Sequence, residues 1–126
     1  MGAGDGWERT LLRLSLNERS SIHSVLAESV DRPGLSGLDA RTHALVSLGA
    51  LVALDAPPTS YECAVDAARA AGATPDDIVG VLIAVGPTVG LARVVAAAPQ
   101  LARSIGYDID AALEEADDTV KQPSGA

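Results

Sequence analysis

The chain has 126 residues, 48% apolar and 21% charged, which is too apolar for a disordered chain and long enough for one domain with a modest core. Its nine Lys and Arg against 17 Asp and Glu give a net charge of −8, the wrong sign for binding nucleic acid. Cys63 is the only cysteine, so a disulfide framework and a multi-thiolate zinc site within one chain are excluded.

The start of the chain indicates its compartment. Residues 1–7 are acidic and rich in glycine, with neither a basic start nor an apolar signal segment. We therefore expect a soluble, cytoplasmic protein. Eight Arg against one Lys, with abundant Ala and Val, is typical of a GC-rich bacterial gene.

Two amphipathic helices are expected in the first half of the chain. The first covers about residues 17–30, carries His23 at its polar edge, and ends at the Pro-Gly turn of residues 31–34. The second begins near Asp39, a good N-cap residue, and continues to about Leu54. The apolar stripe of this second helix is Leu45, Leu48 and Val52.

A third helix follows Pro57-Pro58 and covers about Thr59 to Ala71, with Gly72 as its stop. Thr59 and Glu62 have the spacing of a capping box, although Pro57 could instead be the first helical residue.

The fourth helix starts at residues 74–77, where a hydroxyl cap, a proline and two acids favour helix initiation. The following residues, 78–98, are almost continuously apolar. Gly86-Pro87 should divide this run into a helix ending near Val85 and another over about residues 87–104.

The C-terminal end of the chain carries much of its negative charge, with six acids in residues 107–126. Asp108 opens a short acidic helix that we expect to end near Asp118. Residues 119–126 are expected to be disordered.

The apolar run of residues 78–98 is about as long as a membrane span. Gly86-Pro87 at its middle, Arg93 inside it and the lack of a basic flank favour the absence of a span. A helix that is apolar on all sides must instead be covered on all sides by protein. Because so short a chain offers little cover, we predict an obligate homo-oligomer.

Asp39, His43 and Ser47 form the first candidate for chemistry, because residues four apart on a helix can touch as an acid, a base and a nucleophile. Backbone N–H groups in mid-helix are already bonded, however, so this set has no oxyanion site. We favour a solvated polar stripe over a catalytic set.

Glu62, Asp66 and Arg69 share one face of the next helix. Two carboxylates could act as an acid/base pair or as half of a metal site, but no His or further acid lies at ligand spacing. We favour a solvent-exposed stripe of charges, and we predict neither a metal nor a cofactor.

Cys63, three residues after Ser60, could be a small buried side chain or a reactive thiol. The neighbouring Glu62 and Asp66 oppose ionisation of the thiol, which favours burial. Arg93 either reaches a carboxylate of another subunit or lines a pocket for an anion, and we favour the first.

Three segments resemble the carboxymuconolactone decarboxylase / alkylhydroperoxidase D family. They are Leu38-Asp39-Ala40-Arg41-Thr42, Ala67-Ala68-Arg69-Ala70-Ala71-Gly72-Ala73-Thr74-Pro75-Asp76-Asp77-Ile78 and Val85-Gly86-Pro87-Thr88-Val89-Gly90-Leu91-Ala92. The resemblance covers about residues 36–106, inside a single domain expected over residues 1–118. It implies an all-α bundle of about six helices that forms trimers or hexamers, with the active site beside a helix hairpin near the subunit interface.

The resemblance also implies where catalytic groups should lie. The peroxidase branch has a CxxC pair followed four residues later by His, with a Glu on the preceding helix; the decarboxylase branch shares the His and often adds an acid. Counted back from Gly72, the matching positions here are Pro57 and Ser60 for the thiols, Ala64 for the His, Ala44 for the Glu and Gly80 for the further acid. None of these groups stands at its matching position.

We therefore expect a family member that has lost the peroxidase and decarboxylase groups and binds a small hydrophobic or weakly acidic ligand beside Ser60, Cys63 and Arg93. The alternative is an enzyme with a relocated site, either a Cys63-dependent peroxidase or a lactone decarboxylase that uses His43 or Tyr61 as its base. A protein-interaction module is a third interpretation, based on the acidic C-terminal segment alone.

Overall fold

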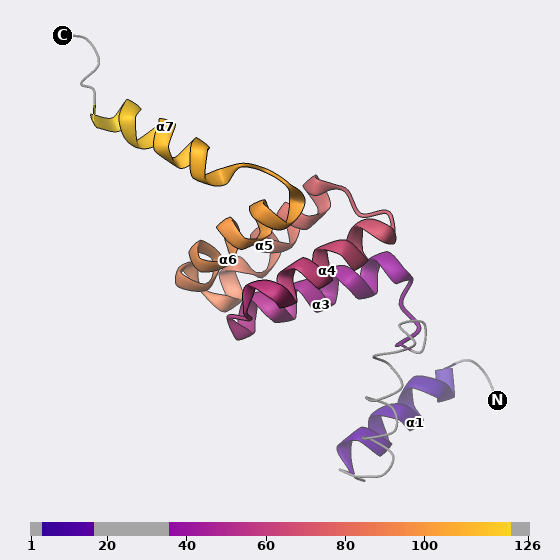
Figure 1. Cartoon of the computed structure of the whole chain (residues 1–126). Helices are drawn as coiled ribbons and strands as arrows, with labels where there is room; N and C mark the ends of the chain where they lie inside the picture. The colour runs from indigo at the N-terminus through magenta and orange to yellow at the C-terminus, as the bar shows by residue number, and fades with distance from the viewer. Residues whose placement is uncertain (1–3, 17–35, 122–126) are drawn as a thin grey trace. The chain divides into compact units, whose positions relative to one another are not determined.

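The computed structural model describes residues 4–16 and 36–121, and the elements in these ranges are all α-helices (Figure 1). The all-α prediction is confirmed for this part of the chain. Contacts divide the chain at residue 39 into two units, which are described separately. The single domain expected over residues 1–118 stays a prediction.

The N-terminal unit contains one described helix, α1 (Gly4–Ser15), which was not predicted. Its large apolar side chains recur every three or four residues and so form a stripe along the helix: Trp7, Leu11 and Leu14. The helix predicted over residues 17–30, including His23, lies outside the described residues.

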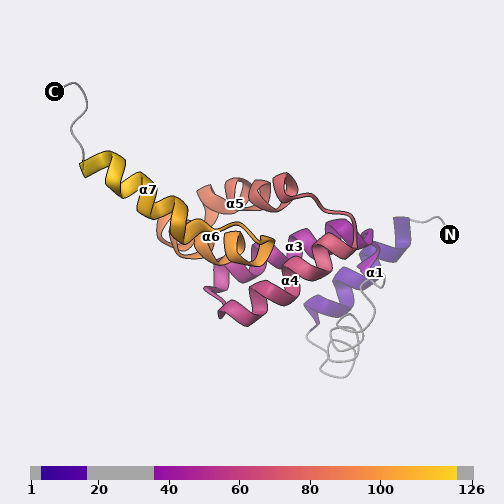
Figure 2. The same cartoon turned by 45° about the horizontal axis from the view of Figure 1, so that its top comes forward.

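Five helices follow in the second unit. They are α3 (Ala40–Leu54), α4 (Pro58–Ala70), α5 (Pro75–Val89), α6 (Leu91–Ile105) and α7 (Ile109–Lys121). Both α3 and α6 pack against α4 and α5, so these four helices form a bundle (Figure 2). α7 projects from this bundle beyond the end of α6 (Figures 1 and 2).

The core lies between the four bundle helices and is built from aliphatic side chains and one tyrosine. The largest fully buried side chains are Tyr61, Leu48, Ile78, Leu101, Val52 and Val65. The stripe predicted for α3 is confirmed at Leu48 and Val52, and Leu45 is partly buried against the same core. This packing of one stripe per helix is what holds the bundle together.

The two helix starts with capping signals differ. At α5 the Asp77 N–H donates to the Thr74 hydroxyl at 3.1 Å, and the Thr74 N–H donates to the Asp77 carboxylate at 2.8 Å, which confirms the predicted cap as a capping box. At α4 the box expected from Thr59 and Glu62 was wrong. Pro57-Pro58 provide the N-cap and the first helical residue, so Thr59 is already inside the helix.

An ion pair ties α3 to the start of α5. Arg41 Nη2 lies 2.6 Å from Asp77 Oδ2. The hydrogen bond from the Thr74 N–H, together with Arg41, lowers the pKa of the Asp77 carboxyl from 3.8. The end of α4 lies close to the predicted stop at Gly72. Gly72 adopts a φ of 95°, a left-handed conformation that ends the helix.

The division between α5 and α6 was predicted at the wrong place. α5 continues through Pro87 to Val89, and the helices separate at Gly90. Pro87 lies in the last turn, where its missing N–H costs a single backbone bond and the helix is about to end. Gly90 adopts φ 93° and ψ 157°, which side-chain-bearing residues rarely do, so the chain turns there.

The acidic helix predicted from Asp108 is present as α7, whose Ala111 N–H donates to the Asp108 carboxylate at 3.1 Å. It continues to Lys121, beyond the end expected at Asp118, because no helix breaker occurs before residue 123. Residues 122–126 lie outside the described part. Within the described ranges, no helix has the length and hydrophobicity needed to cross a bilayer.

Candidate functional site

The α3–α4 hairpin carries a surface hollow beside the first turns of α4. Ser60, Cys63 and Ala64 lie on one side of α4. With Thr59, and with Leu51 from α3, they line an open hollow of about 480 Å³, here named the α4 hollow. Its lining is mainly apolar, with two hydroxyls and one thiol as its polar groups.

Cys63 is exposed in the structure, so the burial that we favoured for it was wrong. The core side of α4 is occupied by Tyr61, Val65 and Ala68, and Cys63 lies on a different side of the helix. The thiol therefore lines the α4 hollow and is accessible to small molecules.

Tyr61, a candidate general base, belongs to the core side of α4. Its side chain is 2% exposed, and its hydroxyl donates a hydrogen bond to the Leu51 carbonyl at 3.2 Å. Burial, and next the charge of Asp55, raise the pKa of the phenol from 10.0. A phenol that is buried, bonded and harder to ionise is poorly suited to accept a proton at neutral pH.

Arg93 reaches a carboxylate of its own chain. Its Nη1 lies 3.1 Å from Asp55 Oδ2, whereas we favoured a carboxylate from another subunit. Asp55 follows α3 with a φ of 54°, a left-handed conformation that Asp tolerates better than most residues. The pair is about half exposed and joins the start of α6 to the α3–α4 connection, and Arg93 is not among the residues that line the α4 hollow.

The second candidate group, on α4, is confirmed as exposed. Glu62, Asp66 and Arg69 all lie at the surface. The Arg69 guanidinium donates to the Ile105 carbonyl at the end of α6, at 3.4 Å. In the described ranges no group of three His, Cys, Asp or Glu residues is placed to hold a metal ion.

The first candidate group, on α3, remains separate from the α4 hollow. Asp39 immediately precedes α3 and is exposed, His43 is half-buried, and Ser47 is exposed. None of the three is among the residues that line the hollow. Their roles stay predictions.

Of the five positions to which the resemblance assigns catalytic groups, four fall on or near the α4 hollow, whereas Gly80 is half-buried on α5 and is not among the lining residues. Ser60 and Ala64 are part of its lining, and Pro57 precedes the same helix. Ala44 is buried on α3, two helical turns before Leu51 and on the same side of the helix. The hollow therefore lies where the resemblance places the family's chemistry, and Ser60 and Ala64 stand there in place of the thiol and the imidazole.

Two further hollows were not predicted. One, the α3–α5 groove, measures about 430 Å³ and is lined by Thr42, Leu45, Val46, Gly49, Ala50, Val81, Ala84 and Val85. The other, the α5–α6 groove, measures about 410 Å³ and is lined by Pro75, Val79, Leu82, Ala98, Leu101, Ala102, Ile105 and Tyr107. The apolar outer faces of α3 and α5 could have indicated the first groove, whereas no sequence signal marks the second.

Comparison with known proteins supports the resemblance. Residues 26–103, more than half of the chain, match the family model described as "Carboxymuconolactone decarboxylase family". The match begins ten residues before the expected segment and ends three residues before its end. Searches of curated proteins and of solved structures gave no match.

Proposed function

The chain belongs to the carboxymuconolactone decarboxylase family, and on that premise we propose that it binds a small, mainly apolar molecule in the α4 hollow and lacks the family's peroxidase and decarboxylase chemistry. The observation that carries this proposal is the lining of the hollow. Ser60 and Ala64 stand there where the resemblance implies a thiol and an imidazole.

The proposed lack of peroxidase and decarboxylase chemistry follows from the side chains that these positions lack. Thiol–disulfide exchange needs an attacking and a resolving thiol, and the chain has one cysteine. General acid–base catalysis near neutral pH needs a group that titrates there, and a methyl group at Ala64 cannot do so. The fold of the site is kept while its reactive groups are absent.

The same lining defines the ligand. Leu51 and Ala64 offer apolar surface, and the Thr59 and Ser60 hydroxyls can exchange hydrogen bonds with one polar group. No charged residue belongs to the lining, and the Arg93 guanidinium is paired with Asp55. Of the two ligands expected from the sequence, hydrophobic or weakly acidic, these contacts favour the hydrophobic, neutral one.

Protection of Cys63 from alkylation tests the binding proposal. We expect 2-naphthol to slow the reaction of the folded protein with iodoacetamide, and 2-naphthoate, its charged analogue, to slow it less. Ser60→Phe should fill the hollow and abolish the protection by 2-naphthol. If neither compound changes the alkylation rate of the wild type, binding in this hollow is wrong.

The exposure of Cys63 favours one alternative, a one-cysteine peroxidase. The thiolate would take an oxygen atom from a hydroperoxide, giving an alcohol and a sulfenic acid that an added dithiol reduces. We expect no consumption of cumene hydroperoxide with dithiothreitol by wild type or by Cys63→Ser. Activity that is present in the wild type and lost in Cys63→Ser would replace our proposal by this alternative.

A lactone decarboxylase using His43 or Tyr61 is the second form of that alternative. We expect no turnover of carboxymuconolactone by the wild type. Turnover that disappears in His43→Ala or Tyr61→Phe would establish the relocated site.

We also propose that the chain forms a homo-oligomer, as the sequence predicts, with three or six copies implied by the resemblance. The support is the exposed apolar surface of α3 and α5: Val46 is exposed in the lining of the α3–α5 groove, and Ile83 is exposed elsewhere on α5. That the protein is bacterial and cytoplasmic likewise stays a proposal, based on its composition. Light scattering measures the subunit number, and a monomeric mass at micromolar concentration would contradict self-association.

A further inference from the structure

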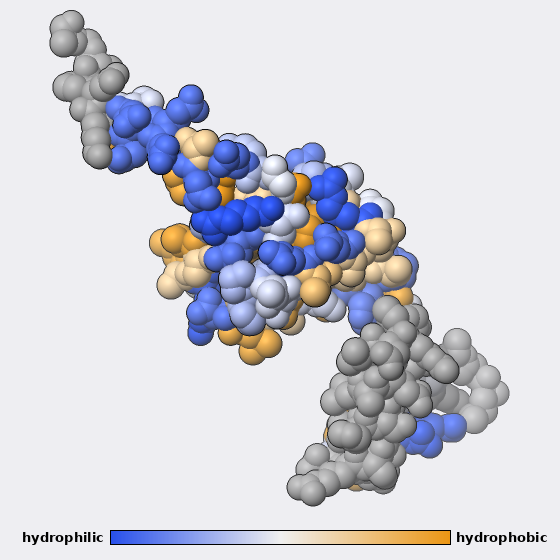
Figure 3. Space-filling view, in the orientation of Figure 1, coloured by the Kyte–Doolittle hydropathy of each residue, from blue (hydrophilic) through white to orange (hydrophobic). Residues whose placement is uncertain are grey.

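α7 carries an apolar stripe that its own chain covers only in part, at the half-buried Ile109 and Ala112. The stripe consists of Ile109, Ala112, Leu113, Ala116 and Val120, which recur every three or four residues. Leu113 is 53% exposed and Val120 is 81% exposed. The rest of the helix is strongly hydrophilic, and Figure 3 shows this surface, with a hydrophobic patch only near its base.

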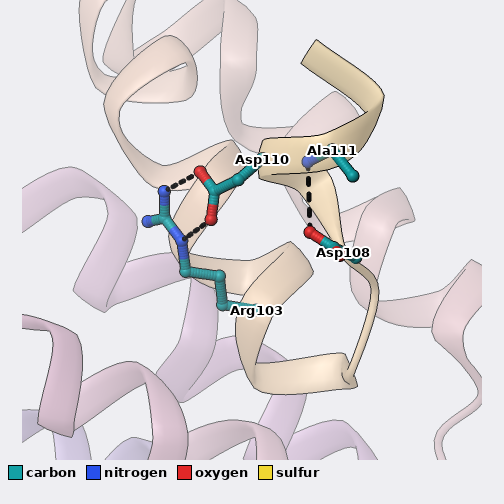
Figure 4. A network of polar contacts seen from close by, with 4 residues as sticks. All are labelled: Arg103, Asp108, Asp110 and Ala111. Carbon is teal, nitrogen blue, oxygen red and sulfur yellow. Dashed lines mark hydrogen bonds and ion pairs between the residues drawn. The ribbon is translucent and has the colours of Figure 1, made fainter. Parts of the chain in front are cut away.

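Polar contacts fix the direction in which α7 leaves the bundle. The Arg103 guanidinium binds both carboxylate oxygens of Asp110, at 2.9 and 3.3 Å (Figure 4). The Asp108 carboxylate caps the helix by accepting from the Ala111 N–H. With Gly106 at a φ of 98° in the short connection, these contacts direct α7 away from the bundle (Figures 1 and 2).

The α5–α6 groove, defined above by its lining, is an apolar surface of matching size. Its residues on α5 extend from Pro75 to Leu82 and those on α6 from Ala98 to Ile105, seven residues or about 10 Å in each case. Leu113 and Val120 are also seven residues apart. Two turns of the α7 stripe therefore have the same length as the groove.

Charge distinguishes two possible partners of the α7 stripe. α7 has five acids and one lysine, so two α7 helices packed stripe to stripe would bring like charges together. The lining of the groove has no charged residue, and the end formed by Pro75 and Ile105 has both Arg69, bonded to the Ile105 carbonyl, and the acid Asp76 beside it. An uncharged lining can cover the apolar stripe without bringing two acidic helices together, so charge favours the groove over a second α7 as the partner of the stripe.

We propose that α7 of one copy packs its apolar stripe into the α5–α6 groove of a second copy. A second copy supplies the helix because the Arg103–Asp110 contact directs each α7 away from its own bundle. The proposal rests on the self-association proposed above and is independent of ligand binding in the α4 hollow.

Crosslinking between two different single-cysteine variants tests the exchange. Both variants carry Cys63→Ser, which removes the native thiol; one adds Leu113→Cys on the stripe and the other Val79→Cys in the groove. Val79 is 47% exposed, so its replacement is accessible. When the two full-length chains, differing in tag size, are co-expressed and treated with a short bis-maleimide, we expect a covalent heterodimer.

The matched control is Ala111→Cys, on the opposite side of α7 from the stripe, co-expressed with the same Val79→Cys chain. We expect at least tenfold less heterodimer from the control. Equal yields from both pairs, or crosslinking only between two Leu113→Cys chains, would overturn the proposal. So would an intrachain product in a chain carrying both Leu113→Cys and Val79→Cys.

Light scattering of variants in the α7 stripe gives a second readout. It separates the proposed exchange of α7 from the proposed self-association. Leu113→Asp is expected to lower the mass of the assembly at fixed concentration, while Ala111→Asp leaves it unchanged. If the wild type is oligomeric and Leu113→Asp has the same mass and helix content, the exchange of α7 is wrong and self-association stands. A monomeric wild type would overturn both.

Discussion

The two sides of α4 contrast in what they contribute to the protein. On one side Tyr61, Val65 and Ala68 are buried and join α4 to the rest of the bundle. On the other, the half-buried Ser60 and the exposed Cys63 line an open hollow. One helix therefore separates the residues that hold the fold from the positions that the family resemblance assigns to chemistry.

If the reactive groups are lost as proposed, this separation explains how the chain keeps the family fold without them. Replacing a thiol or an imidazole on the open side of α4 removes no buried side chain, so the bundle loses little packing energy. Replacements on the core side have no such freedom. The contrast predicts unequal effects of mutation on stability, which decrease from the core side to the hollow.

The largest expected effect is at Tyr61, on the core side. Tyr61→Ala should lower the free energy of unfolding by about 3–5 kcal/mol, the range for removing a large buried aromatic side chain. Urea unfolding followed by circular dichroism measures the change, with Glu62→Ala on the exposed side as the control. A loss below about 1 kcal/mol, comparable to that of a surface substitution, would break the contrast between the two sides.

Two threonine substitutions test the same contrast with a smaller expected loss of stability. Thr74→Ala removes the N-cap of α5 and should cost about 1 kcal/mol of stability. Thr59→Ala changes a residue that lines the hollow and caps nothing, so its effect should stay within about 0.5 kcal/mol. Thermal unfolding of the two variants side by side makes the comparison, and equal losses would contradict it.

Local signals account for what the sequence predicted well. The capping box of α5 joins residues three apart, Gly72 ends a helix by its own conformation, and Asp108 caps α7 from the position just before its first residue. Each depends on neighbours in the chain, so single residues carry the information. The family could be recognised for the same reason, since its clearest segment contains the α5 start.

Contacts between distant residues account for the errors. Arg93 pairs with Asp55, 38 residues earlier, and nothing near Arg93 in the sequence indicates that partner. Cys63 is exposed because Tyr61 and Val65 take the core side of α4, a choice made by packing against other helices. The end of α5 was misplaced because the strong breaker Pro87 lies in a last turn that tolerates it, and Gly90 makes the turn.

Alkaline pH provides a smaller test of the core side. Burial raises the pKa of Tyr61 above 10.0, so the folded state favours the protonated phenol more than the unfolded state does. Its contribution to stability is complete below pH 10 and should be lost as the pH rises beyond that value. The melting temperature of the wild type should therefore fall more steeply above pH 10 than that of Tyr61→Phe, with Tyr107→Phe as the control.

At neutral pH the same variant isolates one hydrogen bond. Tyr61→Phe removes the hydroxyl that donates to the Leu51 carbonyl at 3.2 Å and should cost about 0.5 kcal/mol, the low end for such bonds. In the alkaline test, melting temperatures of wild type and Tyr61→Phe that fall in parallel above pH 10 would show that the Tyr61 phenol is not the group whose ionisation destabilises the protein.

The smallest effect is expected at Cys63. Cys63→Ser should change the free energy of unfolding by less than about 0.5 kcal/mol, because the side chain is exposed and lines the hollow instead of packing in the core. Alkylation rates separate this interpretation from partial burial, since an exposed thiol reacts directly from the folded state. A thiol moved to the core side by Cys63→Ser with Val65→Cys should react only through unfolding, about a thousandfold more slowly if the variant keeps about 4 kcal/mol of stability. Similar rates for the two thiols would mean that α4 exposes both of its sides, and the division between fold and chemistry on this helix would be lost.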